Sequence, residues 1–128
     1  GKYITPQPIE NLLSNDNFIN QAMVVAEGRP YVTALIIPNF EALKDYLPKL
    51  NIDFTNWDEV VNMDKVKEFY HQKIEQIQRQ LSGFEKVKKF ILMPAEFEIG
   101  SGEITPTLKV KRNVVQQKYA EMIGRMYQ

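Results

Sequence analysis

Two apolar runs on either side of a short turn constrain the fold of this chain most strongly. Residues 18–26 and 31–37 are rich in β-branched and aromatic side chains, and Glu27-Gly28-Arg29-Pro30 separates them. Such side chains favour extended strands, and a glycine-containing connection of three to five residues is typical of a hairpin. The sequence therefore predicts an antiparallel β-hairpin that other elements must cover.

The segments around this hairpin carry helical patterns. Pro6 and Pro8 fit the first turn of a helix, where their missing amide hydrogens cost little, and Thr5 can cap that helix. Three apolar residues then fall on one helical face: Ile9, Leu12 and Leu13. Shorter helices are predicted at residues 40–47 and near residues 57–61.

The strongest helical pattern lies between residues 64 and 81. Apolar residues recur there at steps of three and four: Val66, Phe69 or Tyr70, Ile74, Ile77 and Leu81. Gly83 follows, and glycine often closes a helix in the left-handed conformation. We therefore expect one helix over residues 64–81 with Gly83 just past its end.

The last third of the chain is predicted to add one strand and one helix. Residues 87–93 have the composition of a strand that Pro94 ends, and residues 113–127 have the spacing of a single helix. Its apolar stripe would be Val115, Tyr119, Met122 and Met126. This order of elements indicates an α+β fold over residues 1–128, with a small mixed sheet that includes the hairpin and packs with several helices.

The composition argues against several classes of protein. Sixteen basic and sixteen acidic residues cancel, so the chain lacks the net charge that favours nucleic acid or an anionic membrane. The absence of cysteine excludes disulfides, thiolate nucleophiles and sulfur-ligated metals. No apolar run approaches the roughly 20 residues of a membrane-spanning helix. We expect a soluble intracellular domain, and the start at Gly1 rather than Met indicates a piece of a longer protein.

Lys109 is the first candidate for chemistry. It stands in a loop with Gly102 and Pro106, just before the basic start of the last helix. A lysine ammonium suits contact with a phosphate or carboxylate oxygen whose charge changes during a reaction. A lysine in such a loop is more commonly a solvated surface residue, and the residue pattern by itself leaves both interpretations open.

The single histidine, His71, is a weaker candidate. A zinc site would need further histidine or cysteine ligands, and the chain offers neither. No motif supports a Ser-His-Asp triad, so we interpret His71 as a structural or exposed residue. Phe84 and Phe90 flank a small basic cluster of Lys86, Lys88 and Lys89. Basic and aromatic residues together can bind single-stranded nucleic acid, but a strand with one charged face explains them more simply.

Two separated segments resemble the C-terminal domain of the adenylate-forming enzymes. Residues 1–10, GKYITPQPIE, resemble the glycine loop and proline-started helix that follow the hinge of these enzymes. Residues 102–112, GEITPTLKVKR, resemble the loop that holds the family's catalytic lysine. Residues 31–38 and 84–90 fit the same pattern, so the resemblance covers nearly the whole chain.

The second motif points to one subfamily. Many acetyl-, aryl- and peptide-synthetase relatives place a glycine directly before the lysine, whereas Leu108 precedes Lys109 here. The string Thr105-Pro106-Thr107-Leu108-Lys109 resembles the long-chain fatty-acid–CoA ligases. The leucine in place of the family's glycine therefore indicates long-chain fatty acids as the substrate class. It does not change the assignment of Lys109 as the catalytic lysine.

The resemblance implies a two-step reaction and a role for named residues. A fatty acid attacks ATP to give acyl-AMP and diphosphate, and coenzyme A then displaces AMP. Lys109 would serve the first step, and Gly1, Lys2 and Tyr3 would border the channel for coenzyme A in the second. Mg²⁺, ATP and the acyl chain would be bound mostly by an N-terminal domain that is absent from this chain, so the chain alone would be inactive. The parent enzyme would be cytoplasmic, with peripheral membrane association left open.

The sequence leaves alternative interpretations open for several residues and for the function. Gly1 can equally be a residue left by cloning. Lys111 and Arg112 would more commonly serve solubility or an ion pair than contact phosphates of coenzyme A. A stand-alone protein-interaction module that retains this fold is the alternative function, and a nucleic-acid-binding domain is disfavoured by the zero net charge.

Overall fold

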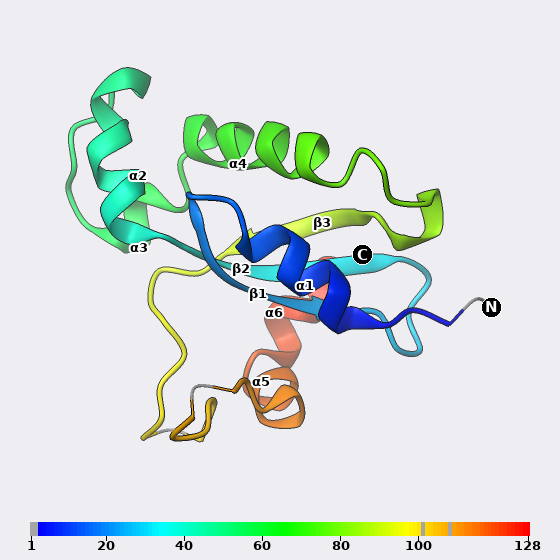
Figure 1. Ribbon diagram of the computed structural model, residues 1–128. Coiled ribbons are helices and arrows are strands. Elements are labelled where there is room, and N and C mark those ends of the chain that lie inside the picture. Colours follow the sequence, from blue (N-terminus) through cyan, green and yellow to red (C-terminus); the bar gives the residue numbers. More distant parts are fainter. Residues whose placement is uncertain (1–2, 101, 108) are drawn as a thin grey trace. The chain divides into compact units, whose positions relative to one another are not determined.

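The computed structural model describes residues 3–100, 102–107 and 109–128, in two compact units. Gly1–Pro94 forms the N-terminal unit and Ala95–Gln128 forms the C-terminal unit. The predicted α+β class is confirmed, because the described residues form one three-stranded sheet and a set of helices. Figure 1 shows the elements in chain colours.

The sheet lies in the N-terminal unit and has the order β1-β2-β3. Strands β1 (Ile19–Val25) and β2 (Val32–Pro38) are antiparallel, whereas β3 (Val87–Leu92) runs parallel to β2. The predicted hairpin and third strand are therefore confirmed, and the sheet is mixed. Gly28 adopts φ +70° in the hairpin turn, a left-handed conformation that residues with a β-carbon rarely adopt.

Helices pack on the sheet because each has one apolar stripe. The helices of this unit are α1 (Pro6–Ser14), α2 (Phe40–Tyr46), α3 (Trp57–Val60) and α4 (Asp64–Ile77), with 3₁₀ turns η1 (Leu47–Leu50) and η2 (Gly83–Glu85). Figure 1 shows α1 and α4 running along the sheet. Their stripes join alternate strand residues in one core cluster that includes Ile9, Leu13, Ala22, Val24, Ala34, Ile36, Val66, Tyr70 and Ile74.

Three predicted details of these helices are wrong. Thr5 occupies the N-cap of α1, but its side chain makes no capping hydrogen bond. Helix α4 ends at Ile77 instead of residue 81, because Gln78 turns inward and uses its amide to pair with Val87. Gly83 is not left-handed; it begins η2, where Ser82 and Glu85 form a capping box.

The C-terminal unit contains two short helices where one was predicted. Helix α5 (Arg112–Lys118) and helix α6 (Ala120–Arg125) are separated at Tyr119, whose backbone leaves the helical region at φ −108° and ψ 23°. The predicted stripe is only partly right, because Val115 and Met126 are buried but Ile123 takes the buried place expected for Met122. Figure 1 shows the two helices following a long loop that comes from β3.

A buried glutamine joins the end of α4 to the start of β3. The Gln78 side chain is 1% exposed; its Nε2 donates to the Val87 carbonyl at 3.0 Å, and its Oε1 accepts from the Val87 amide at 2.8 Å. A buried backbone group left without a partner costs about 1–3 kcal/mol. The pair therefore fixes where the helix stops and where the strand begins.

We expect Gln78→Ala to lower the free energy of unfolding by roughly 2 kcal/mol or more, because both Val87 groups lose their partner. Denaturant unfolding of the chain measures this loss. Gln76→Ala, at an exposed position of the same helix, is the matched control and should change stability by less than about 0.5 kcal/mol. Equal effects of the two substitutions would contradict the role given to Gln78.

A buried tyrosine should make stability depend on alkaline pH. Tyr70 donates its hydroxyl to the Phe18 carbonyl at 2.7 Å, and burial together with the charge of Asp16 raises the pKa of Tyr70 above its usual value. A raised folded-state pKa means that the stabilisation is complete below the unfolded-state pKa of about 10 and is lost as the pH rises above it. We expect the free energy of unfolding to fall above about pH 10, and less steeply in Tyr70→Phe. Denaturant unfolding between pH 7 and 11 measures both slopes, and equal slopes would contradict this cause.

Candidate functional site

The predicted catalytic lysine lies in a small hairpin of the C-terminal unit. We call residues 103–111 the lysine hairpin; the structure describes all of them except Leu108. Ile104 and Val110 form an antiparallel bridge between its two arms. The Lys111 amide donates to the Glu103 carbonyl at 2.8 Å, and the Thr105 amide donates to the Lys109 carbonyl at the same distance. Paired backbone groups therefore flank Lys109 on the returning arm.

A threonine side chain closes the tip of this hairpin. The Lys109 amide donates to Thr105 Oγ1 at 3.0 Å, and the hydroxyl oxygens of Thr105 and Thr107 are 2.9 Å apart. Thr105 thus holds Lys109 through both its backbone and its side chain. The Lys109 side chain is exposed and makes no ion pair with any residue that the structure describes. The ammonium is therefore available to an anionic ligand.

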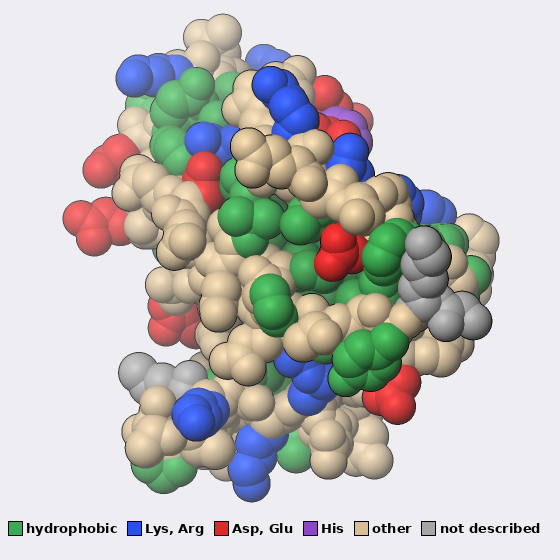
Figure 2. Space-filling view, turned by 45° about the vertical axis from the view of Figure 1, so that its right-hand side comes forward, with side chains coloured by type: hydrophobic (Ala, Val, Ile, Leu, Met, Phe, Trp, Pro, Cys, Tyr) green, Lys and Arg blue, Asp and Glu red, His purple; other side chains and the backbone are tan. Residues whose placement is uncertain are grey.

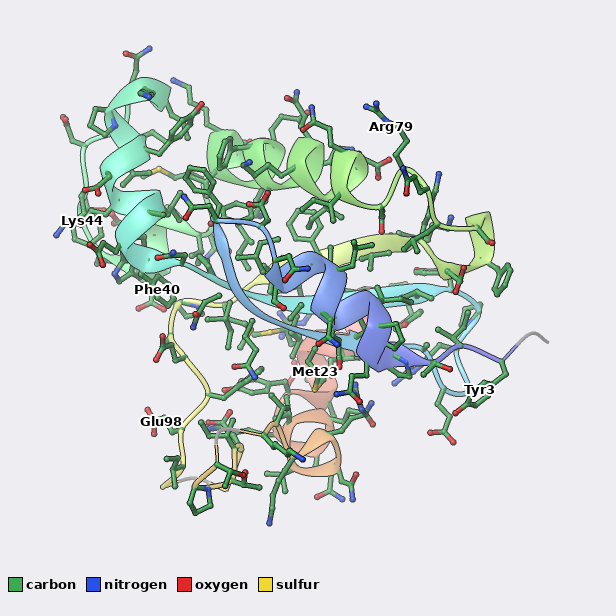
Figure 3. The ribbon with its side chains drawn as sticks, viewed as in Figure 1. Tyr3, Met23, Phe40, Lys44, Arg79 and Glu98 are labelled. Atoms are coloured by element: carbon green, nitrogen blue, oxygen red, sulfur yellow. The ribbon has the colours of Figure 1, made fainter. Side chains whose placement is uncertain are left out.

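A buried carboxylate anchors the outgoing arm of the hairpin. Glu103 is 1% exposed, and three groups converge on it. The Glu98 amide donates to Oε1 at 3.1 Å, the Lys118 ammonium lies 3.2 Å from the same oxygen, and the Tyr119 hydroxyl donates to Oε2 at 2.7 Å. Figure 3 shows Glu98 on the loop that follows β3. A buried charge needs such partners, since an unpaired one would be strongly destabilising.

Tyr119 connects this carboxylate to the break between α5 and α6. Burial, followed by the hydrogen bond to Glu103 and the charges of Glu103 and Glu98, raises the pKa of the Tyr119 hydroxyl above its usual value. The hydroxyl therefore stays protonated and keeps donating at neutral pH. The ring of Tyr119 also contacts the buried ring of Phe97, with 6.3 Å between centroids.

The other predicted site residues belong to the N-terminal unit. Gly1 and Lys2 lie outside the described residues. Tyr3 is 86% exposed, and Figure 3 shows it just before α1. Within the lysine hairpin, Thr105 contacts Lys109, and Glu103 pairs with Lys111. His71 is exposed on α4, which is one of the two placements expected for it.

Thr105, Glu103 and Tyr119 were not predicted as site residues. Glu103 reads as a polar loop residue in the sequence, and the predicted single helix placed Tyr119 in an apolar stripe. Sixteen positions separate the two partners, so no helical or strand period relates them. The contact between Thr105 and Lys109 spans only four positions. Threonine side chains often accept hydrogen bonds from backbone amides in turns, and this preference is the only sequence signal that could have indicated the role of Thr105.

The described residues around Lys109 fit one anionic oxygen rather than a whole nucleotide. They supply one ammonium and two threonine hydroxyls, but the structure shows no backbone cradle for a chain of phosphates. In the described part of the chain no group of three or more His, Cys, Asp or Glu residues could hold a metal ion.

Hollows and charged side chains also occur elsewhere on the described surface. Two hollows of about 480 and 510 Å³ lie beside Tyr46 in the N-terminal unit, and neither is lined by a predicted site residue. On the face that Figure 2 shows, Lys and Arg side chains are scattered among acidic and other polar ones. No helix within the described residues is long and apolar enough to cross a membrane.

Comparison with known proteins identifies the family. The sequence model described as "AMP-binding enzyme C-terminal domain" matches residues 1–128, the whole length of the chain. The chain belongs to this family.

Curated relatives of this family member confirm the predicted subfamily resemblance. The chain is 32% identical over 129 residues to the long-chain-fatty-acid–CoA ligase FadD15 of Mycobacterium tuberculosis, covering 99% of this chain and 21% of that protein. It is 29% identical over 130 residues to the peroxisomal long chain acyl-CoA synthetase 7 of Arabidopsis thaliana, covering 99% of this chain and 19% of that protein. The chain therefore spans about a fifth of the length of the curated relatives it matches.

Solved structures confirm the fold. The A-PCP didomain of a carboxylic acid reductase from Segniliparus rugosus, in complex with AMP, superposes with a TM-score of 0.77 at 22% identity. That match covers 98% of this chain and 16% of the other. A fatty acyl CoA synthetase from Mycobacterium tuberculosis superposes with a TM-score of 0.57 at 15% identity, covering 95% of this chain and 19% of the other.

Proposed function

We propose that this chain is the C-terminal domain of an AMP-forming long-chain fatty-acid–CoA ligase. The parent enzyme would convert a long-chain fatty acid, ATP and coenzyme A to acyl-CoA, AMP and diphosphate through acyl-AMP. Support comes from the family match over residues 1–128 and from the long-chain acyl-CoA synthetases among its relatives. The observation that carries the proposal is the exposed Lys109 side chain, which has no ion-pair partner among the described residues and stands on a hydrogen-bonded hairpin in the motif that resembles the subfamily.

Lys109 would act in the first half-reaction. The carboxylate oxygen of the fatty acid attacks the α-phosphorus of ATP, the new acyl–phosphate bond forms, and the bond to diphosphate breaks. Negative charge gathers on the oxygens around phosphorus during this displacement, and a nearby ammonium stabilises it. The role is electrostatic, because no proton has to leave Lys109.

The start of the chain would act in the second half-reaction. There the thiol of coenzyme A attacks the acyl carbon of acyl-AMP and AMP leaves. Gly1 would line the channel of the thiol arm, because a residue without a β-carbon lets the backbone and a ligand approach closely. Lys2 and Tyr3 would border the same channel. The exposure of the Tyr3 side chain is compatible with such a contact.

Most ligands of this reaction would be bound outside the chain. ATP, Mg²⁺ and the acyl chain would be held mainly by the N-terminal domain of the parent, which is also the partner of this domain. We place the parent in the cytoplasm, where peripheral contact with a membrane would give access to long-chain fatty acids.

Lys109→Ala in the parent enzyme should slow acyl-AMP formation by about 10²–10³-fold, the usual cost of removing one transition-state contact. Conversion of supplied acyl-AMP to acyl-CoA should be nearly unchanged. Single-turnover assays of the two half-reactions separate these effects. Lys67→Ala, which removes an exposed lysine from α4, is the control and should alter neither step. Normal acyl-AMP formation in Lys109→Ala would rule out the catalytic role of the lysine.

Gly1→Val in the parent should show the opposite pattern. A branched side chain in the thiol channel should slow conversion of supplied acyl-AMP to acyl-CoA by about 10-fold or more, because misplacement of a reacting group by about 1 Å can cost 10²-fold. Acyl-AMP formation should stay within about twofold of the wild type. Gly1→Ala is the graded control, with a smaller effect on the same step, and an unchanged second step in both variants would remove Gly1 from the channel.

A further inference from the structure

The Glu103 carboxylate joins three separate segments of the C-terminal unit. One oxygen accepts from the Glu98 amide and lies beside the Lys118 ammonium of α5, and the other accepts from the Tyr119 hydroxyl at the break before α6. The backbone of Glu103 adds two further links, because its amide donates to the Glu98 carbonyl at 3.1 Å and its carbonyl accepts from Lys111. One residue thus ties the loop to the helices and to the returning arm of the lysine hairpin.

A series of paired backbone groups connects Glu103 with Lys109. The arms are joined first at Glu103 and Lys111, next at Ile104 and Val110, and then at Thr105 and Lys109. Each link is a short contact between residues of fixed register, so the position of the first pair limits the position of the last. A catalytic group needs such support, since its own exposed side chain packs against little.

From this arrangement we propose that Glu103 is a positioning residue that holds Lys109 in place for acyl-AMP formation. The proposal rests on the proposed function of Lys109. Glu103 does not itself contact the reacting atoms; it acts by holding the lysine hairpin against the junction of α5 and α6. The carboxylate is 1% exposed and has a partner on each oxygen, which is the arrangement of a structural anchor rather than of an acid or base that meets solvent.

Glu103→Gln in the parent enzyme is the first test. Glutamine keeps the shape and one acceptor oxygen but loses the charge that attracts Lys118 and one acceptor for the Glu98 amide or the Tyr119 hydroxyl. We expect acyl-AMP formation to slow by about 10- to 100-fold, with thioester formation from supplied acyl-AMP within about twofold of the wild type. The control is Glu121→Gln, an exposed glutamate of α6 that pairs with Arg125 at 3.0 Å and should leave both steps unchanged.

Tyr119→Phe provides a milder second variant should Glu103→Gln fold poorly. It removes only the hydroxyl that donates to Glu103 Oε2 and keeps the ring contact with Phe97. We expect a smaller loss that falls on the same half-reaction. Equal losses in both half-reactions, accompanied by a lower melting temperature of the parent, would show a general structural role and overturn the proposal.

Combining substitutions tests whether Glu103 acts through Lys109. In the Lys109→Ala background, Glu103→Gln should cause no further loss of acyl-AMP formation, because the group that it positions is gone. The same fold-loss in both backgrounds would overturn the positioning role while leaving the role of Lys109 intact. Normal acyl-AMP formation in Lys109→Ala alone would instead overturn the proposed function, and the positioning role with it.

Hydrogen exchange gives a readout that does not depend on activity. In the parent enzyme, the hydrogen-bonded amides of Glu103, Thr105, Lys109 and Lys111 should exchange faster in Glu103→Gln than in the wild type, whereas amides of β1 and β2 should be unchanged. Unchanged exchange at these four amides would show that the carboxylate does not hold the hairpin, and would overturn the proposal whatever the kinetics.

Discussion

The pairing of β2 with two strands of opposite direction sets the architecture of the N-terminal unit. A hairpin turn is enough to place β1 beside β2, but a parallel neighbour requires a long crossover connection. The chain uses residues 39–86, which include α4, for that crossover. Side chains of α4, and of α1 before the hairpin, contribute to the core along the sheet. Every residue of β2 is buried, so this strand carries much of the apolar surface around which the unit folds.

The loop of the C-terminal unit is held by polar contacts. It has one isolated bridge and no regular strand among the described residues. A buried carboxylate with an amide, an ammonium and a hydroxyl around it joins this loop to the helices, in addition to the buried apolar residues of the unit. Such a network specifies one geometry, because each group that lost its partner would be left buried and unsatisfied. A loop that presents a single charged side chain, such as Lys109, needs a fixed geometry to place that charge.

The sequence predicted most of the fold because its signals are local and periodic. The hairpin, α1, α3 and the third strand lie close to where composition and spacing placed them. The errors have physical causes that spacing does not reveal: the Gln78 amide ends α4 early, and the Tyr119 backbone divides the last helix. Lys109 was predicted as a site residue from a motif resemblance, and only the structure showed that it lies in a hairpin. Glu103 was beyond sequence reasoning, since its partners are held by tertiary contacts.

The register of the lysine hairpin limits how this loop can evolve. Neighbouring residues on an extended arm point to opposite sides, so inserting or deleting one residue between the two arms would turn the side chain of Lys109 over. Replacing a tip residue such as Pro106 or Thr107 would leave that alternation intact. Divergence in this segment should therefore proceed by changes of residue type at constant length, and a relative with a longer or shorter segment would need to offer its cation from a different position.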